Sequence, residues 1–354
     1  MLFGKKSQPL LGLDITTSSV KLIELSQSGK RYRVESYSAE PTPPSSVNEK
    51  VIVDARAVGE AIRRAVKRAG ARATDVAIAI SGDAAITKVI QMPSSLSERD
   101  LEGQVEIQAD QYIPFPMEEV SFDYEIVGPN ENDPELLDVL LVATRTENVE
   151  QRESAVQAAG LSAEIVDVEA FALENACQLM SHQIPDAGKE QSVAIVDIGA
   201  SSTTFSVLKD LKVIYTRDFA FGGQQLTEEI MRNYGLSMED AGRAKKQGGL
   251  PCNYQPEVLE PFIDDMTQQV SRSLQFYLAS GGGGREQPDM ILVCGGCANI
   301  PGIADVIASR VGIPTEVGDP LGQMKISSKA KSQGVHNDAS ALLTACGLAL
   351  RSFD

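Results

Sequence analysis

The chain has 354 residues, of which 42% are hydrophobic and 23% charged, and its formal net charge is −17. This composition is typical of a soluble globular protein with room for two or three domains. The acidic balance argues against a nucleic-acid partner, because a phosphate backbone requires a concentrated basic face. No apolar run approaches the roughly 18 residues that span a bilayer, and the Cys residues show no disulfide framework. We therefore expect a cytoplasmic protein.

The chain opens with a predicted β-hairpin. Residues Leu10 to Leu25 form an apolar stretch, a polar turn and a second stretch with apolar alternation. A strand near Tyr32 to Tyr37 follows. A helix is then predicted from about Asp54 to Ala69, with its apolar residues on one face and Gly70 as its end. A strand from Asp75 to Ile80 closes this first region.

Residues 82–162 predict an inserted α/β module. Its expected elements are a strand at 85–91, a helix at 97–112, strands at 121–127 and 137–143, and a helix at 147–159. This order predicts a small separate sheet with helices on one face.

The second half of the chain repeats the opening theme. The pattern Asp-Ile-x-x-Ser-Ser stands at Asp14 to Ser19 and again at Asp197 to Ser202, each time between two apolar strands. Internal similarity of this kind predicts two related lobes, each of which opens with a hairpin.

The two repeated turns suit a nucleoside triphosphate. A tight turn of small hydroxyl residues points backbone N–H groups and hydroxyls at phosphate oxygens. The carboxylates of Asp14 and Asp197 would be repelled by phosphate, so we expect them to hold Mg²⁺ through its waters. Lys21 lies in the strand after the first turn and can reach the phosphate charge. One copy alone would fit an ordinary hairpin turn equally well.

Two glycine pairs add to this pattern. Gly295 and Gly296 follow an apolar strand, where paired glycines let the backbone approach a ribose or a flat ring. Gly222 and Gly223 precede a helix predicted at 224–234, so its N-terminal amides are expected near an anion. Each pair also fits a plain strand-to-helix turn.

The hairpins and glycine turns occur in the same order as in the actin superfamily, which this chain therefore resembles. The position of the insert in the chain resembles that in the FtsA family. Residues 109–116, 166–173 and 234–249 resemble the PilM family of type IV pilus assembly. The resemblance implies an α/β, actin-like two-lobed fold around a nucleotide cleft, with an FtsA-type inserted α/β subdomain. The implied parts are a first lobe (1–81, 163–190 and 335–354), the insert (82–162), a second lobe (191–220 and 288–334) and its smaller helical subdomain (221–287).

The resemblance also implies the residues of a site for ATP or ADP with Mg²⁺. The first phosphate loop would comprise Asp14, Thr16, Thr17, Ser18, Ser19 and Lys21. The second would comprise Asp197, Gly199, Ala200, Ser201, Ser202 and Thr203. The remaining cleft residues would be Gly222, Gly223, Lys245, Gly295, Gly296 and Asn299. The chain departs from its relatives at Gly242, where a Glu often contacts the ribose or base, and at Cys297, where a third Gly is common.

Hydrolysis would need a group that orients water toward the γ-phosphate. The acidic candidates are Asp167 and Glu169, and the alternative for both is a carboxylate at a helix start. The catalytic residue is therefore left unassigned, and we expect at most a weak ATPase.

By resemblance, the protein would bind the cytoplasmic N-terminal tail of PilN and link the inner-membrane alignment complex to the pilus motor ATPases. The insert is the expected docking site, with Tyr112, Phe115 and Phe122 as candidates, although aromatic residues are more often core residues. Two alternatives stay open: an FtsA-like division filament and a small-molecule kinase of the same superfamily. Residues 338–347 predict a helix packed into the first lobe, so membrane association is expected only through a partner. Self-association is possible.

Overall fold

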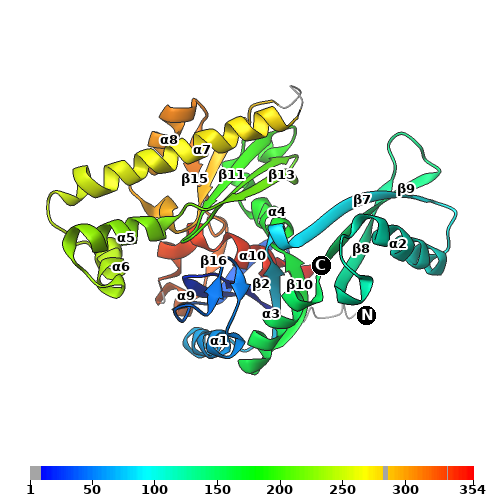
Figure 1. Cartoon of the computed structure of the whole chain (residues 1–354), viewed down its shortest axis with the longest axis horizontal. Helices are drawn as coiled ribbons and strands as arrows, with labels where there is room; N and C mark the ends of the chain where they lie inside the picture. The colour runs from blue at the N-terminus through cyan, green and yellow to red at the C-terminus, as the bar shows by residue number, and fades with distance from the viewer. Residues whose placement is uncertain (1–8, 282–285, 333) are drawn as a thin grey trace.

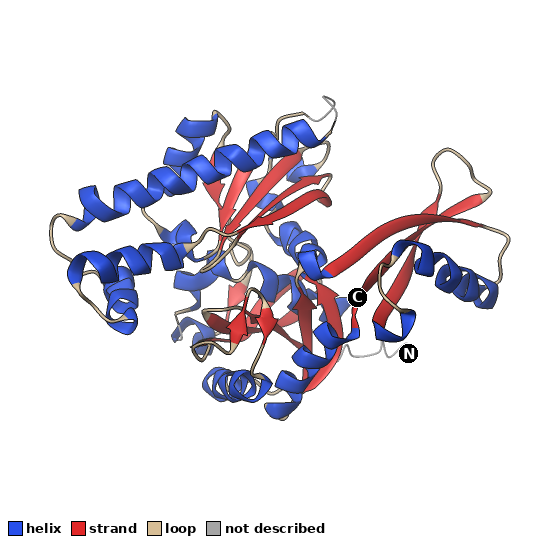
Figure 2. Ribbon diagram, in the orientation of Figure 1, coloured by secondary structure: helices blue, strands red, loops and turns tan. Residues whose placement is uncertain are grey.

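The computed structural model describes residues 9–281, 286–332 and 334–354, so the first eight residues of the predicted first lobe lie outside it. Two large sheets with flanking helices form two lobes, and a small third sheet extends away from them (Figure 1). Both lobes combine helices and strands, as the colouring in Figure 2 shows. The predicted α/β class is confirmed.

The first lobe is built on a six-stranded sheet in the order β10-β6-β1-β2-β3-β16. The strands are β1 (Leu10–Ile15), β2 (Ser19–Ser28), β3 (Arg31–Pro41), β6 (Asp75–Ile80), β10 (Ser162–Val168) and β16 (Lys325–Ile326). Helix α1 (Ala55–Ala69) covers one face. Asp54 caps its start by accepting the Ala57 amide, and Gly70 ends it in a left-handed conformation at φ 55°. A short hairpin of β4 (Val47–Asn48) and β5 (Val51–Ile52) precedes α1.

The second lobe repeats the opening hairpin within a five-stranded sheet in the order β13-β12-β11-β14-β15. The strands are β11 (Ser192–Ile198), β12 (Thr203–Lys209), β13 (Lys212–Phe219), β14 (Met290–Cys294) and β15 (Thr315–Val317). Its helices are α5 (Gly223–Tyr234), α6 (Met238–Gln247), α7 (Glu260–Ser280) and α8 (Ile303–Val311). Helices α5 and α6 pack together at the far end of this lobe (Figure 1).

Helices α4 (Glu169–Leu179) and α10 (Leu343–Leu350) pack against each other between the two sheets (Figure 1). Gly347 allows α10 to approach α4 closely, and Gly12 allows α10 to approach the first sheet. A Cβ on Gly12 of β1 would lie 2.0 Å from the Ala345 carbonyl oxygen, and one on Gly347 would lie 1.7 Å from that of Ala172. The predicted C-terminal helix therefore lies in the core, after the short helix α9 (Ser328–Ser332) and the 3-10 segment Val335–Ala341.

The inserted module has a three-stranded sheet in the order β7-β9-β8, with one face covered by α2 (Glu98–Tyr112). Its strands are β7 (Ala85–Pro93), β8 (Val120–Pro129) and β9 (Leu136–Arg145). The second predicted helix, α3 (Thr146–Ala158), packs elsewhere: its Ala155 and Val156 join the core beneath α1. A Cβ on Gly59 of α1 would lie 2.6 Å from the Ala158 Cβ, so the two helices touch directly. We accordingly group α3 with the first lobe.

Candidate functional site

The structure brings the two repeated Asp turns face to face. Asp14 lies near the end of β1 and Asp197 near the end of β11, and the turns that follow these strands are in contact. The hydroxyls of Thr17 and Ser201 are 3.0 Å apart and share a hydrogen bond. The sequence repeat therefore predicted two loops that meet in space, although they lie 184 residues apart.

The first turn is held by its own side chains. The Thr16 hydroxyl donates to the Ser19 carbonyl at 2.9 Å and accepts the Ser19 amide at 3.1 Å. The Thr16 carbonyl accepts the Thr42 hydroxyl at 2.8 Å. Thr16 thus fixes the shape of the turn, and Ser18 at its tip is exposed.

The second turn is shaped by the start of α5. The amides of Gly223 and Gln224 donate to the carbonyls of Gly199 and Ala200 at 3.0 and 2.8 Å. A Cβ on Gly222 would lie 2.4 Å from the Ala200 oxygen, so this position requires glycine. These two amides therefore donate to the loop. They do not face an anion, contrary to the expectation for this helix start.

Lys245 supports the same helix start. Its ammonium donates to the Gly223 carbonyl at 2.7 Å and to the Thr227 hydroxyl at 2.6 Å. Burial lowers the pKa of Lys245. A Cβ on Gly242, one turn earlier on α6, would meet nothing within 4 Å.

Charge is concentrated behind the two turns. Lys21 donates to Asp14 at 2.8 Å, and their side chains are 18% and 10% exposed. Burial alone would lower the pKa of Lys21, but attraction to Asp14 and Asp197 outweighs it, and the pKa is raised. Burial raises the pKa of Asp197 to about 6, with Lys21 opposing the shift and Asp14 adding to it. Since two carboxylates share one ammonium here, an added divalent cation would balance the charge.

A magnesium ion between Asp14 and Asp197 would also need water or phosphate oxygens as ligands. In the described part of the chain, no group of three or more His, Cys, Asp or Glu side chains lies close enough to hold a metal. Asp14 and Asp197 would hold Mg²⁺ through its waters, because this ion keeps several waters and is commonly shared with substrate phosphates.

The late glycine pair lies against the second turn. Gly295 has φ +85°, and a Cβ there would lie 2.5 Å from Asp197 Oδ1 and 2.3 Å from the Ile198 oxygen. Its amide donates to the Ser340 carbonyl at 2.8 Å, and the Asn299 side-chain amide donates to the Asn337 carbonyl at 3.1 Å. This turn thus connects the second lobe to the 3-10 segment before α10. A Cβ on Gly296 would meet nothing within 4 Å.

Both candidate catalytic carboxylates are already paired. Asp167 accepts the Val168 amide at 2.7 Å, forms an ion pair with Arg351 at 2.5 Å, and its side chain is 4% exposed. Glu169 begins α4 and forms an ion pair with Lys50 at 2.8 Å. Burial raises the pKa of Glu169, and Lys50 opposes the shift. The alternative of a carboxylate in the first turn of a helix describes Glu169 well.

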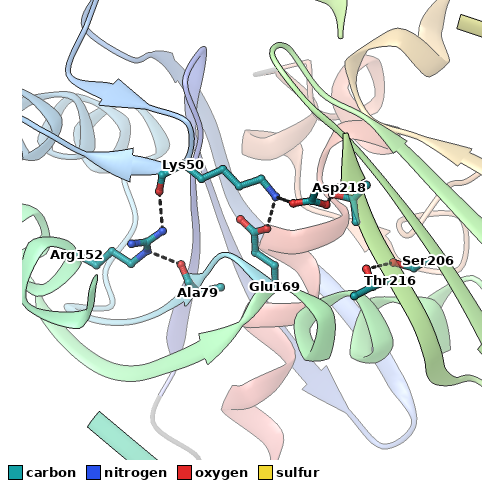
Figure 3. A network of polar contacts seen from close by, with 8 residues as sticks. Lys50, Ala79, Arg152, Glu169, Ser206, Thr216 and Asp218 are labelled. Carbon is teal, nitrogen blue, oxygen red and sulfur yellow. Dashed lines mark hydrogen bonds and ion pairs between the residues drawn. The ribbon is translucent and has the colours of Figure 1, made fainter. Parts of the chain in front are cut away.

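Sequence reasoning missed a network of polar contacts between the two lobes. Lys50 bridges Glu169 and Asp218, and Arg152 donates to the backbone of Lys50 and Ala79 (Figure 3). Of these residues, only Glu169 was a candidate from the sequence. No local pattern reveals the contacts of Lys50, because the short β4–β5 hairpin has no periodicity and its partners are more than 100 residues away.

The predicted partner residues differ in exposure. Tyr112, at the end of α2, is 43% exposed, with the Lys88 ammonium 5.3 Å from its ring centroid. Phe115 and Phe122 are half-buried against the core of the inserted module, and the Arg145 guanidinium lies 4.9 Å from the Phe115 ring centroid. Tyr112 is the most accessible of the three.

Comparison with known proteins identifies the family. The family model "Type IV pilus assembly protein PilM" matches residues 12–353. The chain belongs to this family. A solved structure of a PilM-PilN type IV pilus biogenesis complex is similar over 98% of both chains, with a TM-score of 0.78 and 27% identity. The actin-like two-lobed fold predicted from the sequence is thereby confirmed.

Two curated proteins are similar to parts of this chain. The cell division protein FtsA of Bacillus subtilis (strain 168) is 37% identical over 79 residues, 22% of this chain and 18% of that protein. The ethanolamine utilization protein EutJ of Escherichia coli (strain K12) is 27% identical over 127 residues, 36% of this chain and 41% of that protein. The chain thus spans less than half the length of these curated relatives. Among the described residues, no helix combines the length and apolar character needed to cross a membrane.

Proposed function

We propose that this PilM-family protein is a nucleotide-binding scaffold of type IV pilus assembly that binds the N-terminal tail of PilN. The observation that supports the partner most strongly is the similarity to the PilM-PilN complex, which covers 98% of both chains. In this proposal the protein acts in the cytoplasm, lies against the inner membrane through PilN, and links the alignment complex to the pilus motors.

The nucleotide, ATP or ADP with Mg²⁺, would lie between the two Asp turns. Three observations support the proposal: the two loops face each other, charged side chains are buried behind them, and a side chain at Gly222 or Gly295 would overlap its neighbours. Since Thr17 and Ser201 touch, a polyphosphate between them requires the turns to separate. The nucleotide thus acts as a ligand that sets the spacing of the lobes.

We propose that turnover is slow or absent. A group that orients water must be free to reach the terminal phosphate. Asp167 is held by Arg351 and a backbone amide, and Glu169 by Lys50. Neither carboxylate can act without first leaving an ion pair.

The inserted module is the proposed docking site for the PilN tail. Its three-stranded sheet has β7 and β8 as edges, to which an extended peptide could add. Several of its large apolar side chains are exposed. They are Val89 (52%), Ile107 (60%), Tyr112 (43%), Ile126 (45%) and Val127 (64%).

A deletion tests this site without disturbing the lobes. Ala85 and Thr144 are paired across β7 and β9, so a two-residue Asn-Gly turn can join them in place of residues 86–143. We expect the shortened protein to lose binding of a fluorescent PilN N-terminal peptide, measured by anisotropy, and to keep MgATP binding. Retained peptide affinity would exclude the insert as the docking site.

A point variant tests the accessible aromatic residue. Tyr112→Ala should weaken peptide binding at least about tenfold, since a central aromatic contact is worth 1.4 kcal/mol or more. Phe276→Ala is the matched control, because Phe276 is also an exposed aromatic residue, at 53%, but lies on α7 of the second lobe. Equal affinities for the two variants would remove Tyr112 from the site.

A further inference from the structure

Lys50 connects three parts of the molecule that are distant in sequence. It lies at the tip of the β4–β5 hairpin in the first lobe, and its ammonium is 2.8 Å from Glu169 at the start of α4. The same ammonium is 2.5 Å from Asp218 on β13 of the second lobe. In Figure 3 the Lys50 side chain extends between the lobes to both carboxylates.

The hairpin that carries Lys50 has a strained turn. Glu49 and Lys50 are its two central residues, with φ +45° and +67°. Two-residue hairpins of this kind favour Asn and Gly, because other side chains are disfavoured at positive φ. Such strain persists only where surrounding contacts determine the conformation, and it is a feature of functional positions.

Arg152 supplies those contacts. Its guanidinium donates to the Lys50 carbonyl at 2.9 Å and to the Ala79 carbonyl at 2.7 Å, and the residue is only 6% exposed (Figure 3). A buried Arg from α3 therefore fixes the turn against β6 of the first lobe. The hairpin presents Lys50 from a rigid base.

Asp218 links this contact to the second phosphate turn. Its other carboxylate oxygen accepts the Thr204 hydroxyl at 2.6 Å, and Thr204 lies in the strand that leaves that turn. Movement of the second turn away from the first lobe would therefore carry Asp218 away from Lys50. Glu169 would stay near Lys50, so the ammonium would keep one partner in either position.

The burial of this cluster distinguishes it from a surface ion pair. The side chains of Lys50, Glu169 and Asp218 are 21%, 27% and 13% exposed. Lys212 also joins β13 to α4, through Glu174 at 2.6 Å, but its side chain is 74% exposed. Exposed pairs contribute little because water and salt screen them, whereas a partly buried pair is screened much less.

We propose that Lys50 is an inter-lobe latch, which holds the cleft closed through Asp218 and must release it for nucleotide to enter or leave. The Thr17–Ser201 contact shows that the two turns meet in the latched arrangement. The nucleotide part of this inference rests on the proposed nucleotide binding, but the latch between the lobes does not.

The direct test is a distance measurement between spin labels on the two lobes of the full chain. Cys252 is the exposed cysteine of the chain and the other four are buried, so Cys252→Ser gives a background for labelling. Labels at Arg64→Cys on α1 and Lys246→Cys on α6 report lobe spacing from exposed positions. Without nucleotide, we expect Lys50→Met and Asp218→Asn each to add a longer-distance population, and Lys212→Met to match the parent.

Release of a fluorescent ATP analogue gives a second readout. Lys50→Met should speed release about tenfold, which corresponds to about 1.4 kcal/mol, and Lys50→Arg should restore slow release. Parental distances in both Lys50→Met and Asp218→Asn would overturn the latch. If the parent binds no nucleotide, the proposed nucleotide binding fails, and the distance measurement still decides the latch.

Discussion

The packing of α10 against α4 can be tested by adding one methyl group at Gly347. The Cβ of alanine would lie 1.7 Å from the Ala172 carbonyl oxygen and 2.5 Å from its carbonyl carbon. The first distance is half of the 3.4 Å at which ordinary contact begins, and both atoms belong to the backbone of α4 at the buried residue Ala172. The helices must therefore separate. Overpacking of this kind costs about 1–3 kcal/mol or more, while the helix propensity of alanine returns about 1 kcal/mol.

Because the overlap is with backbone atoms, we expect a cost at the upper end of this range, about 3 kcal/mol, so that Gly347→Ala lowers the free energy of unfolding by about 2 kcal/mol. Urea denaturation followed by circular dichroism measures this, with midpoints compared under one condition. Gly103→Ala is the matched control, because Gly103 lies within α2 and its Cβ would meet nothing within 4 Å. That variant should be unchanged or more stable by up to about 1 kcal/mol. A Gly347→Ala midpoint equal to that of the wild type would refute the close packing of α4 and α10.

Three further changes probe the cleft and the hairpin. Asp197→Asn should be more stable than the wild type at pH 7 in metal-free buffer, by on the order of 1–3 kcal/mol, because burial raises the pKa of Asp197 from 3.8 to about 6 and its ionisation then opposes folding. The gap should shrink as pH falls from 6 and close near pH 4 in urea titrations, whereas a constant gap would contradict the shift. Gly295→Ala should weaken MgATP binding about tenfold or more, since its Cβ would displace Asp197. Calorimetry measures this with Gly103→Ala as the control, and equal MgATP affinities for the two variants would contradict the prediction. Glu49→Asn should raise the melting temperature, by relief of up to about 1 kcal/mol of strain at φ +45°, and a lower temperature would argue against strain there.

Features that neighbouring residues in the sequence determine were predictable. The Asp-Ile-x-x-Ser-Ser repeat predicted two hairpins, and they face each other as expected of paired lobes. Helix α1 begins after Asp54 and ends before Gly70, because Asp and Gly are common capping residues that can be recognised in the sequence.

Features that depend on tertiary contacts were not predictable. The sequence groups α3 with the insert because the two are contiguous, yet Ala155 and Val156 find their apolar partners under α1. Lys50 stands in a polar stretch, and its role depends on carboxylates 119 and 168 residues away. The amides of Gly223 and Gln224 turned to the second loop rather than to a ligand, because the carbonyls of that loop lie within hydrogen-bond distance.

Calorimetry of the full chain with a PilN N-terminal peptide, with and without MgATP, tests the central claim most directly. We predict saturable binding of the peptide to one site, and separate saturable binding of MgATP to the unliganded protein. Loss of the peptide heat in the variant that lacks residues 86–143, with the MgATP heat retained, would place the two ligands on different parts of the molecule. A folded protein that gives no heat with either ligand would contradict the account.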